Sequence, residues 1–184
     1  QPTAIRNTLE GRLIGDALDI DTFGTGAEDI FQDIEHVQII ACGTSYHSGM
    51  VARYWLEALA GVSCNIEIAS EFRYRQSHVP KNALLVTISQ SGETADTLAA
   101  LRLAKENGAT TIAITHNPRS DITKYSDYVL VNGNRQGQLQ GDSIGTKISQ
   151  LFVLDLIYTL LVKRDISGAK ANKLKTTEAL SNQS

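Results

Sequence analysis

Two short runs of hydroxyl side chains are the part of this sequence best suited to chemistry. Each holds one glycine, follows a short apolar segment and leads into a predicted helix: Cys42-Gly43-Thr44-Ser45 and Ser89-Gln90-Ser91-Gly92-Glu93-Thr94. The first N–H groups of a helix have no partner within it and carry the positive end of its dipole. Short Ser and Thr side chains add O–H donors, and glycine lets a ligand approach the backbone. This pattern is typical of an anion-binding site.

An alternative interpretation of either run is helix capping alone. Ser or Thr followed by Glu forms a capping box at a helix start, and for a single run this is the simpler explanation. Together, however, the two runs hold five hydroxyls and the Gln90 amide, which is more than two caps require. The pair of runs therefore favours a phosphorylated ligand.

The ligand is predicted to be a sugar phosphate rather than a nucleotide. The sequence has neither a GxGxxG motif after its first strand nor a GxxxxGK[ST] motif anywhere. No acidic residue stands where the ribose of a dinucleotide would need one. The Gln90 amide and the clustered alcohols suit a polyol, and no cofactor is expected.

Single reactive side chains near these runs each have an ordinary interpretation beside the chemical one. Glu93 is placed to act as a base, but a carboxylate in a first helical turn also complements the helix dipole. His47 is expected either to touch the ligand or to sit exposed on a helix. Cys42 follows a buried segment, where a packed small residue is more usual than a nucleophile. Catalytic residues therefore stay unassigned, and no metal site is indicated by the spacing of His36, His78 and His116.

The elements that must position these runs alternate between strand and helix. Short apolar or alternating segments predict five strands, at residues 37–41, 64–69, 83–88, 111–115 and 128–131. Longer periodic segments predict helices at 48–59, 94–107 and 148–162. The last of these is apolar on most faces, which predicts a largely buried helix.

Strands joined by helices of this length require crossover connections, and uncharged strands suit a sheet covered on both faces. We therefore predict an α/β fold: a three-layer, doubly wound, five-stranded parallel sheet of the flavodoxin-like type. Ligands of such sheets bind beyond the carboxyl ends of the strands. Function is therefore expected in the loops after the first, third and fifth strands. A helical arm (1–35) and a Lys-rich tail (164–184), helical or frayed, flank the domain (36–163).

Composition excludes several classes of protein. The chain has 184 residues, 42% of them hydrophobic, a normal proportion for one globular domain. Seventeen basic and 20 acidic residues give a net charge of −3, without a basic run, so nucleic acid is not an expected partner. No stretch of 18 apolar residues and no signal-peptide pattern appear, so no membrane association is expected. Two distant cysteines fit a reduced, cytoplasmic protein.

The two runs and the motifs around them resemble the first SIS (sugar isomerase) domain of the glucosamine-6-phosphate synthase family, the isomerizing glutamine–fructose-6-phosphate aminotransferases. The resemblance covers about residues 1–107. It is carried by Cys42 to Ser45, Arg53-Tyr54-Trp55, Glu67 to Arg75 and Ser89 to Thr97. That family forms glucosamine 6-phosphate from fructose 6-phosphate and glutamine. The resemblance implies that Ser89, Gln90, Ser91 and Thr94 hold the phosphate, while Cys42, Gly43, Thr44 and Ser45 line the sugar side.

The last third of the chain departs from that family. Where the family has a Val-Ala-Ser-Thr-Lys segment that contacts the sugar, this chain has Ser143-Ile144-Gly145-Thr146-Lys147, so a Ser contact is expected to be lost at Gly145. Ser143 and Lys147 are retained as candidate sugar-phosphate contacts, although Lys147 is equally expected to be solvated. Residues 142–165 resemble the SIS domains of RpiR-type regulators, which sense sugar phosphates without catalysis.

Three functions follow as expectations. The first is a sugar-phosphate-binding SIS domain that is catalytically incomplete alone, because the family takes its Glu base, ring-opening His and Schiff-base Lys from a second SIS domain and a C-terminal tail. The second is a sensing module without enzymatic activity. The third is a stand-alone isomerase that uses Glu93 and His47. A homodimer is also expected, with the apolar helix Ile148–Leu161 and the N-terminal arm as its surface.

Overall fold

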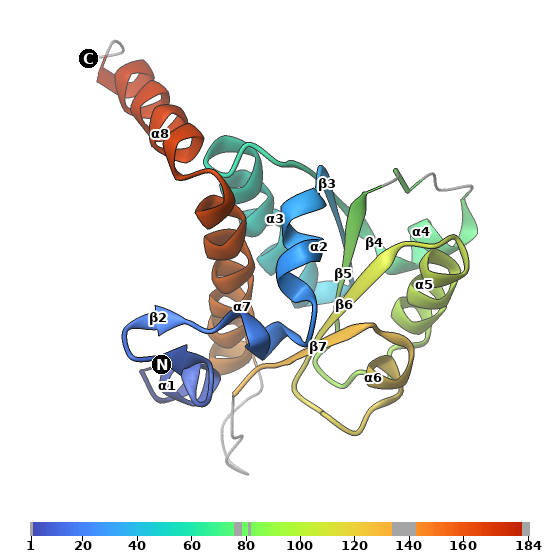
Figure 1. Cartoon of the computed structure of the whole chain (residues 1–184). Coiled ribbons are helices and arrows are strands. Elements are labelled where there is room, and N and C mark those ends of the chain that lie inside the picture. The colour runs from blue at the N-terminus through green and yellow to red at the C-terminus, as the bar shows by residue number, and fades with distance from the viewer. Residues whose placement is uncertain (1, 76–78, 81, 134–142, 182–184) are drawn as a thin grey trace.

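A five-stranded parallel sheet forms the centre of the molecule (Figure 1). The computed structural model describes residues 2–75, 79–80, 82–133 and 143–181. In chain order the strands are β3 (His36–Ala41), β4 (Ser63–Ile68), β5 (Ala83–Ile88), β6 (Thr110–Thr115) and β7 (Tyr128–Val131). Their spatial order is β4-β3-β5-β6-β7, and each neighbouring pair is parallel. The predicted doubly wound sheet is confirmed, and its winding direction reverses between β3 and β5.

The register between β3 and β5 brings the two hydroxyl runs to the same edge of the sheet. All six residues of each strand are buried, as expected for apolar strands covered on both faces. Ala41 at the end of β3 pairs with Ile88 at the end of β5. The runs that start at Cys42 and Ser89 therefore leave the sheet side by side.

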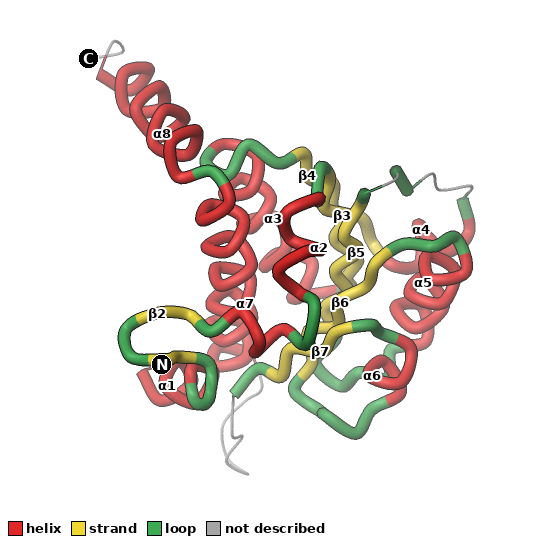
Figure 2. Tube along the Cα trace, in the orientation of Figure 1, coloured by secondary structure: helices red, strands yellow, loops and turns green. Residues whose placement is uncertain are grey.

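Helices cover both faces of the sheet and complete the three layers (Figure 2). One face packs against α2 (Ala27–Asp33), α3 (Gly43–Ala58) and α7 (Ser143–Arg164). The other face packs against α4 (Ala69–Tyr74), α5 (Ala95–Glu106) and α6 (Asp121–Tyr125). Alternate strand residues serve the two cores: Ile39 and Val86 face the first, and Ile40 and Leu85 face the second.

The long helix α7 is a core helix. By length and composition, residues Gly145–Arg164 would also suffice to cross a membrane, but half of that segment is buried within the fold. Val153, Ile157 and Leu161 are at most 1% exposed and pack in the same core as α3. The predicted buried helix is confirmed. Phe152 and Tyr158 of the same helix are only partly buried, so a part of the apolar surface that the sequence suggested for a dimer contact remains accessible.

The N-terminal segment is less helical than expected and lies against the domain. Besides α1 (Pro2–Leu9), the 3-10 helix η1 (Ile20–Phe23) and α2, it holds a hairpin of β1 (Leu13–Ile14) and β2 (Ala17–Leu18). Phe23 and Phe31 are buried in the core beneath the sheet. The Arg12 guanidinium donates to the Val131 carbonyl (2.7 Å), which ties the segment to β7. The boundaries at residues 35 and 163 stay a prediction.

The Lys-rich tail forms helix α8 (Ile166–Ser181), which projects from the end of α7 away from the rest of the molecule (Figure 1). Most of its described side chains are exposed. Of the two interpretations of this tail, helical or frayed, residues 166–181 take the helical one.

Candidate functional site

A cavity of about 650 Å³ lies at the carboxyl ends of β3, β5 and β6. Its walls include eight of the ten residues that the sequence suggested as ligand contacts. The lining consists of Cys42, Gly43, Thr44, Ser45, Ile88, Ser89, Gln90, Ser91, Glu93, Thr94, Thr97, His116 and Asn117. It stands where the winding of the sheet reverses, the usual ligand position in such folds. No Lys or Arg belongs to this described lining.

The start of α3 forms one wall of the cavity without a side-chain cap. Cys42 occupies the N-cap position in extended conformation (φ −127°, ψ 155°), and its side chain makes no capping hydrogen bond. Gly43 follows at φ 56°, in the left-handed region that glycine tolerates best. The capping interpretation therefore fails for this run, and the N-terminus of the helix faces the cavity.

The second run is held in shape by its own hydroxyls. Ser89 Oγ accepts a hydrogen bond from the Gly92 N–H (3.1 Å), and Ser91 Oγ accepts one from the Glu93 N–H (3.2 Å). The N-cap residue of α5, Thr94, makes no side-chain capping bond. Its Oγ1 lies 3.2 Å from Ser89 Oγ instead. These hydroxyls shape the loop and leave the start of α5 uncapped.

The hydrogen bonds of this loop leave protons available to a ligand. A hydroxyl has one proton and two lone pairs. Ser89 and Ser91 each accept from a backbone N–H through a lone pair, so these bonds use the proton of neither hydroxyl. Within the Ser89–Thr94 pair only one hydroxyl donates to the other, so at least one O–H remains for a ligand. The cavity thus offers hydrogen-bond donors, which an anion requires.

Gly92 has to be a glycine for this loop to form. It lies at φ 71°, and a Cβ at this position would come 1.9 Å from Ser120 Oγ. Ser120 is fully buried and donates its hydroxyl to the Asn117 carbonyl (2.6 Å), so it has little room to move. The close contact joins the loop after β5 to the loop after β6.

The loop after β6 contributes residues that sequence reasoning did not assign to the site. His116 and Asn117 line the cavity, although the histidine had been considered only as a metal ligand. The His116 ring lies with Nδ1 3.1 Å from the Asn132 carbonyl oxygen, which can only accept, so Nδ1 carries a proton. Their position in the sequence could have indicated this role, because both residues directly follow β6, the strand that neighbours β5.

Thr97 is the third polar residue of the site that the sequence analysis did not assign. It lies one turn into α5, is 1% exposed, and its Oγ1 has no hydrogen-bond partner. Buried hydroxyls are usually satisfied, so an unpartnered one beside a ligand cavity is unusual. The helical period places Thr97 on the same side as Thr94, which the sequence analysis did not use.

The two side chains suggested for a stand-alone isomerase are not brought together in the cavity. Glu93 lines it, but Glu93 Oε1 accepts the Asp121 N–H at the start of α6 (2.9 Å). His47 is exposed, packs edge-on against the Tyr46 ring, and is not among the lining residues. Glu93 therefore serves as a cap between two loops.

The remaining candidates from the last third of the chain stay predictions. Lys147 lies in the first part of α7, partly buried, and is not among the residues that line the cavity. Ser143 begins α7, and its side chain falls outside the described structure. The loop after the fifth strand, residues 134–142, also lies outside the described residues.

The two cysteines differ in their surroundings. Cys64 is fully buried in β4, where burial, followed by the nearby charge of Glu57, raises the pKa of its thiol to about 12. Cys64 is therefore a packed, unreactive thiol. Cys42 is partly exposed at the cavity wall. Within the described part of the chain, no cluster of three or more His, Cys, Asp or Glu side chains could hold a metal ion.

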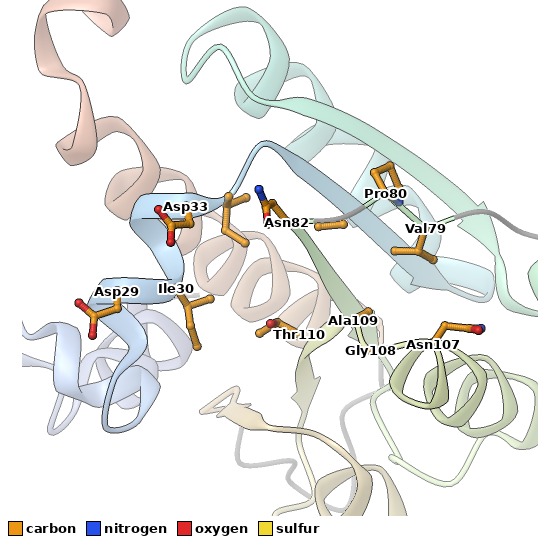
Figure 3. Close-up of a pocket in the computed structure, with 12 residues that line it drawn as sticks. Asp29, Ile30, Asp33, Val79, Pro80, Asn82, Asn107, Gly108, Ala109 and Thr110 are labelled. Atoms are coloured by element: carbon orange, nitrogen blue, oxygen red, sulfur yellow. The ribbon is translucent and has the colours of Figure 1, made fainter.

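A second cavity, of about 370 Å³, opens at the opposite edge of the sheet, where β5 and β6 begin. Figure 3 shows Asp29 and Asp33 of α2 on one side of it and Val79 and Pro80 on the other. Neither hydroxyl run reaches this edge. Ligands of parallel sheets bind at the carboxyl ends of the strands, so the candidate site is the cavity at the start of α3 and α5.

Comparison with known proteins adds an independent line of evidence. The family model described as "SIS domain" matches residues 30–160. Glutamine–fructose-6-phosphate aminotransferase [isomerizing] of Idiomarina loihiensis is 55% identical over 159 residues, which is 85% of this chain and 26% of that protein. The chain therefore spans about a quarter of the length of this curated relative. An alignment of this length also extends the similarity beyond residues 1–107.

Several solved structures share the fold. The C-terminal domain of glucosamine-fructose-6-phosphate aminotransferase from Francisella tularensis superposes with a TM-score of 0.84 and 36% identity, covering 99% of this chain and 51% of that one. The Vibrio vulnificus NanR protein complexed with ManNAc-6P superposes with a TM-score of 0.78, covering 100% of this chain and 69% of that one. At 19% identity the second match concerns the fold alone.

Proposed function

Because this chain belongs to the SIS domain family, we propose that the cavity at the starts of α3 and α5 binds a phosphorylated hexose or hexosamine. The observation that carries the proposal is the pair of helix N-termini at one sheet edge, neither of them capped by its N-cap side chain. Their free N–H groups and the positive ends of their dipoles supply the charge that a phosphate needs. No cationic side chain is required.

In this proposal the loops before α3 and α5 bind different parts of the ligand. Ser89, Gln90, Ser91 and Thr94 hold the phosphate, because their donors surround the start of α5. Cys42, Gly43, Thr44 and Ser45 line the sugar, whose hydroxyls both donate and accept. Of the lining residues from β6, His116 and Asn117 are placed to contact either part. The names of similar proteins contain fructose 6-phosphate and ManNAc-6P, which belong to this chemical class.

Binding, rather than turnover, is the function proposed for these 184 residues. Isomerisation moves a proton between two carbon atoms and needs a base within hydrogen-bond reach of them. Glu93 is the carboxylate of the described lining; the Asp121 N–H holds its Oε1, and His47, its partner in the isomerase hypothesis, does not line the cavity. Incubation with fructose 6-phosphate should therefore give no aldose product. Turnover that Glu93→Gln abolishes would contradict this part of the proposal and favour the stand-alone isomerase.

The test of the binding proposal is calorimetric titration of the chain with fructose 6-phosphate and, separately, with fructose. We expect saturable binding of the phosphorylated sugar and none of the neutral sugar at the same concentrations, because the phosphate meets the two helix N-termini. Equal binding of both sugars would contradict the phosphate assignment. Failure of either sugar to bind would remove the proposed function itself.

The cellular setting and the oligomeric state are also proposals. We expect a soluble domain related to bacterial metabolic enzymes to lie in the cytoplasm. The cytoplasm keeps thiols reduced, and the buried thiol of Cys64 is protonated. A homodimer is proposed as well.

A further inference from the structure

A buried glutamine on α7, outside the cavity lining, contacts a hydroxyl that lines the cavity. Gln150 is 1% exposed and does not belong to the cavity lining. Its Nε2 donates to Ser45 Oγ at 3.0 Å, and its Oε1 accepts from Ser48 Oγ at 3.4 Å. Ser45 lines the cavity in the first turn of α3, while Ser48 lies one turn further along the same helix. The two serines thus hold both ends of one amide.

This arrangement fixes the direction in which Ser45 can donate. An amide nitrogen can donate but not accept, so the Ser45 proton cannot point back at Gln150 Nε2. The amide oxygen, which could accept that proton, accepts from Ser48 Oγ, whereas the contact of the amide with Ser45 Oγ is made through Nε2. With one lone pair occupied by Gln150, the Ser45 hydroxyl has its proton left for the cavity. Ser45 is thereby set as a donor before any ligand arrives.

We propose that Gln150 is a positioning residue, which acts through Ser45 and makes the first loop a donor toward the oxygen atoms of a sugar phosphate. The inference rests on the proposed function, because it concerns the ligand of the same cavity. A preset donor needs no reorientation on binding, which favours affinity. The simpler role for Gln150 is to join α7 to α3, and that role affects stability without affecting ligand contacts.

The experiment separates the two roles with a double-mutant cycle. Gln150→Glu keeps the shape but replaces the donor with an acceptor, so the Ser45 proton turns toward the new carboxyl group. We expect fructose 6-phosphate to bind about tenfold more weakly, the loss of one hydrogen bond to a charged or strongly polar ligand. In a Ser45→Ala background the same substitution should change the dissociation constant less than about twofold, because the hydroxyl through which it acts is gone.

Gln150→Met is the second variant, since it adds no charge to the core and fills a similar volume. It frees the Ser45 hydroxyl without reversing it, so we expect about a threefold loss of affinity with Ser45 present and none with Ser45→Ala. Thr87→Val serves as the stability control. Thr87 is fully buried in β5, donates to the Ile112 carbonyl and does not line the cavity, so its loss should lower the melting temperature without changing affinity.

The outcomes distinguish this inference from the function on which it rests. If the unsubstituted chain binds fructose 6-phosphate and the Gln150 effects disappear in the Ser45→Ala background, the inference is supported. If the chain binds but either Gln150 variant loses affinity equally with and without Ser45, or both bind like the unsubstituted chain, Gln150 is only a packing residue. If the unsubstituted chain does not bind at all, the proposed function fails first and the inference fails with it.

Discussion

At the scale of single residues, the site is built from hydroxyls whose protons are kept available by neighbouring N–H groups. Ser89 accepts from Gly92, Ser91 accepts from Glu93, and Ser45 accepts from Gln150. Ser45 and Ser91 therefore keep their protons for the cavity, and at least one hydroxyl of the Ser89–Thr94 pair does the same. A site that contains no described Lys or Arg can bind an anion on this basis, helped by the dipoles of α3 and α5.

Removal of one of these hydroxyls should weaken binding by a defined amount. Ser89→Ala or Thr94→Ala removes a hydrogen bond to a charged group, and we expect a loss of about 1–2 kcal/mol in binding of a hexose phosphate. Ser70→Ala is a matched control, since Ser70 lies in α4 and does not line the cavity. Calorimetric titration measures the affinity of all three variants for the hexose phosphate. Unchanged affinity in both cavity variants would refute the assignment of this loop to the phosphate.

Two glycines with similar backbone angles make a second test. Gly92 lies at φ 71° and a Cβ there collides with Ser120, whereas Gly108 lies at φ 81° with no atom within 4 Å of such a Cβ. Gly108→Ala should therefore cost about 1 kcal/mol of stability from backbone strain alone. Gly92→Ala should cost more, and it should also abolish phosphate binding because the loop moves. Equal effects of the two substitutions on melting temperature and affinity would contradict the account of this loop.

At the scale of elements, the register of the sheet is what assembles the site. The predicted strands were confirmed because uncharged, β-branched segments between helices have few other structures to adopt. The pairing of Ala41 with Ile88 then brings the two hydroxyl runs together. The sequence could not reveal that His116 would join them, because this depends on how far β6 is shifted along β5. Helices α4 and α6, of six and five residues, are too short to show a helical period.

One carboxylate, in the loop before β7, joins α5 to β6 and should make stability depend on pH. Asp127 Oδ2 accepts from Thr111 N and Oγ1 at 2.9 and 2.7 Å, and Oδ1 lies 2.9 Å from Lys105 Nζ of α5. Burial alone would raise the pKa of Asp127. The hydrogen bonds from Lys105 and Thr111 outweigh burial and hold this pKa below its ordinary value of 3.8.

A lowered pKa in the folded state means that Asp127 stabilises the fold above the ordinary pKa and ceases to do so as the pH falls below it. Asp127→Asn should cost about 1 kcal/mol at pH 7, a modest amount because the side chain is 36% exposed. The difference should shrink as the pH falls below about 4. Asp121→Asn, which affects only an exposed pair with Lys124 on α6, should cost less. Denaturant unfolding at several pH values measures the difference in free energy of unfolding between the unsubstituted chain and Asp127→Asn. A difference that does not change with pH would contradict this role of Asp127.

At the scale of the whole molecule, the apolar surface is distributed differently from the sequence-based expectation. Several apolar residues of α7 are buried inside the chain, and Phe152 and Tyr158 stay partly exposed, so this helix offers a smaller surface for a dimer contact than its sequence suggested. The N-terminal segment is tied down by Phe23, Phe31 and the Arg12 contact with β7. Pattern reasoning could not foresee this docking, because it depends on contacts between residues more than 100 positions apart. The large apolar side chains left exposed include Ile14 of the hairpin and Tyr54 of α3.

These exposed side chains are the basis on which we retain the homodimer proposal. Sedimentation equilibrium should give a mass of about 40 kDa, twice the 20.0 kDa of the chain. Tyr54→Glu, which places a charge on the exposed face of α3, is expected to shift the equilibrium toward the monomer. A species of 20 kDa that does not change with concentration would contradict the proposal.

The most direct test of the central claim is a crystal structure of the chain soaked with fructose 6-phosphate. We expect phosphate density at the start of α5, within hydrogen-bond distance of the hydroxyls of Ser89, Ser91 and Thr94, with the sugar toward Ser45. Phosphate density at the opposite edge of the sheet, beside Asp29 and Asp33, or an empty cavity at saturating ligand, would contradict it.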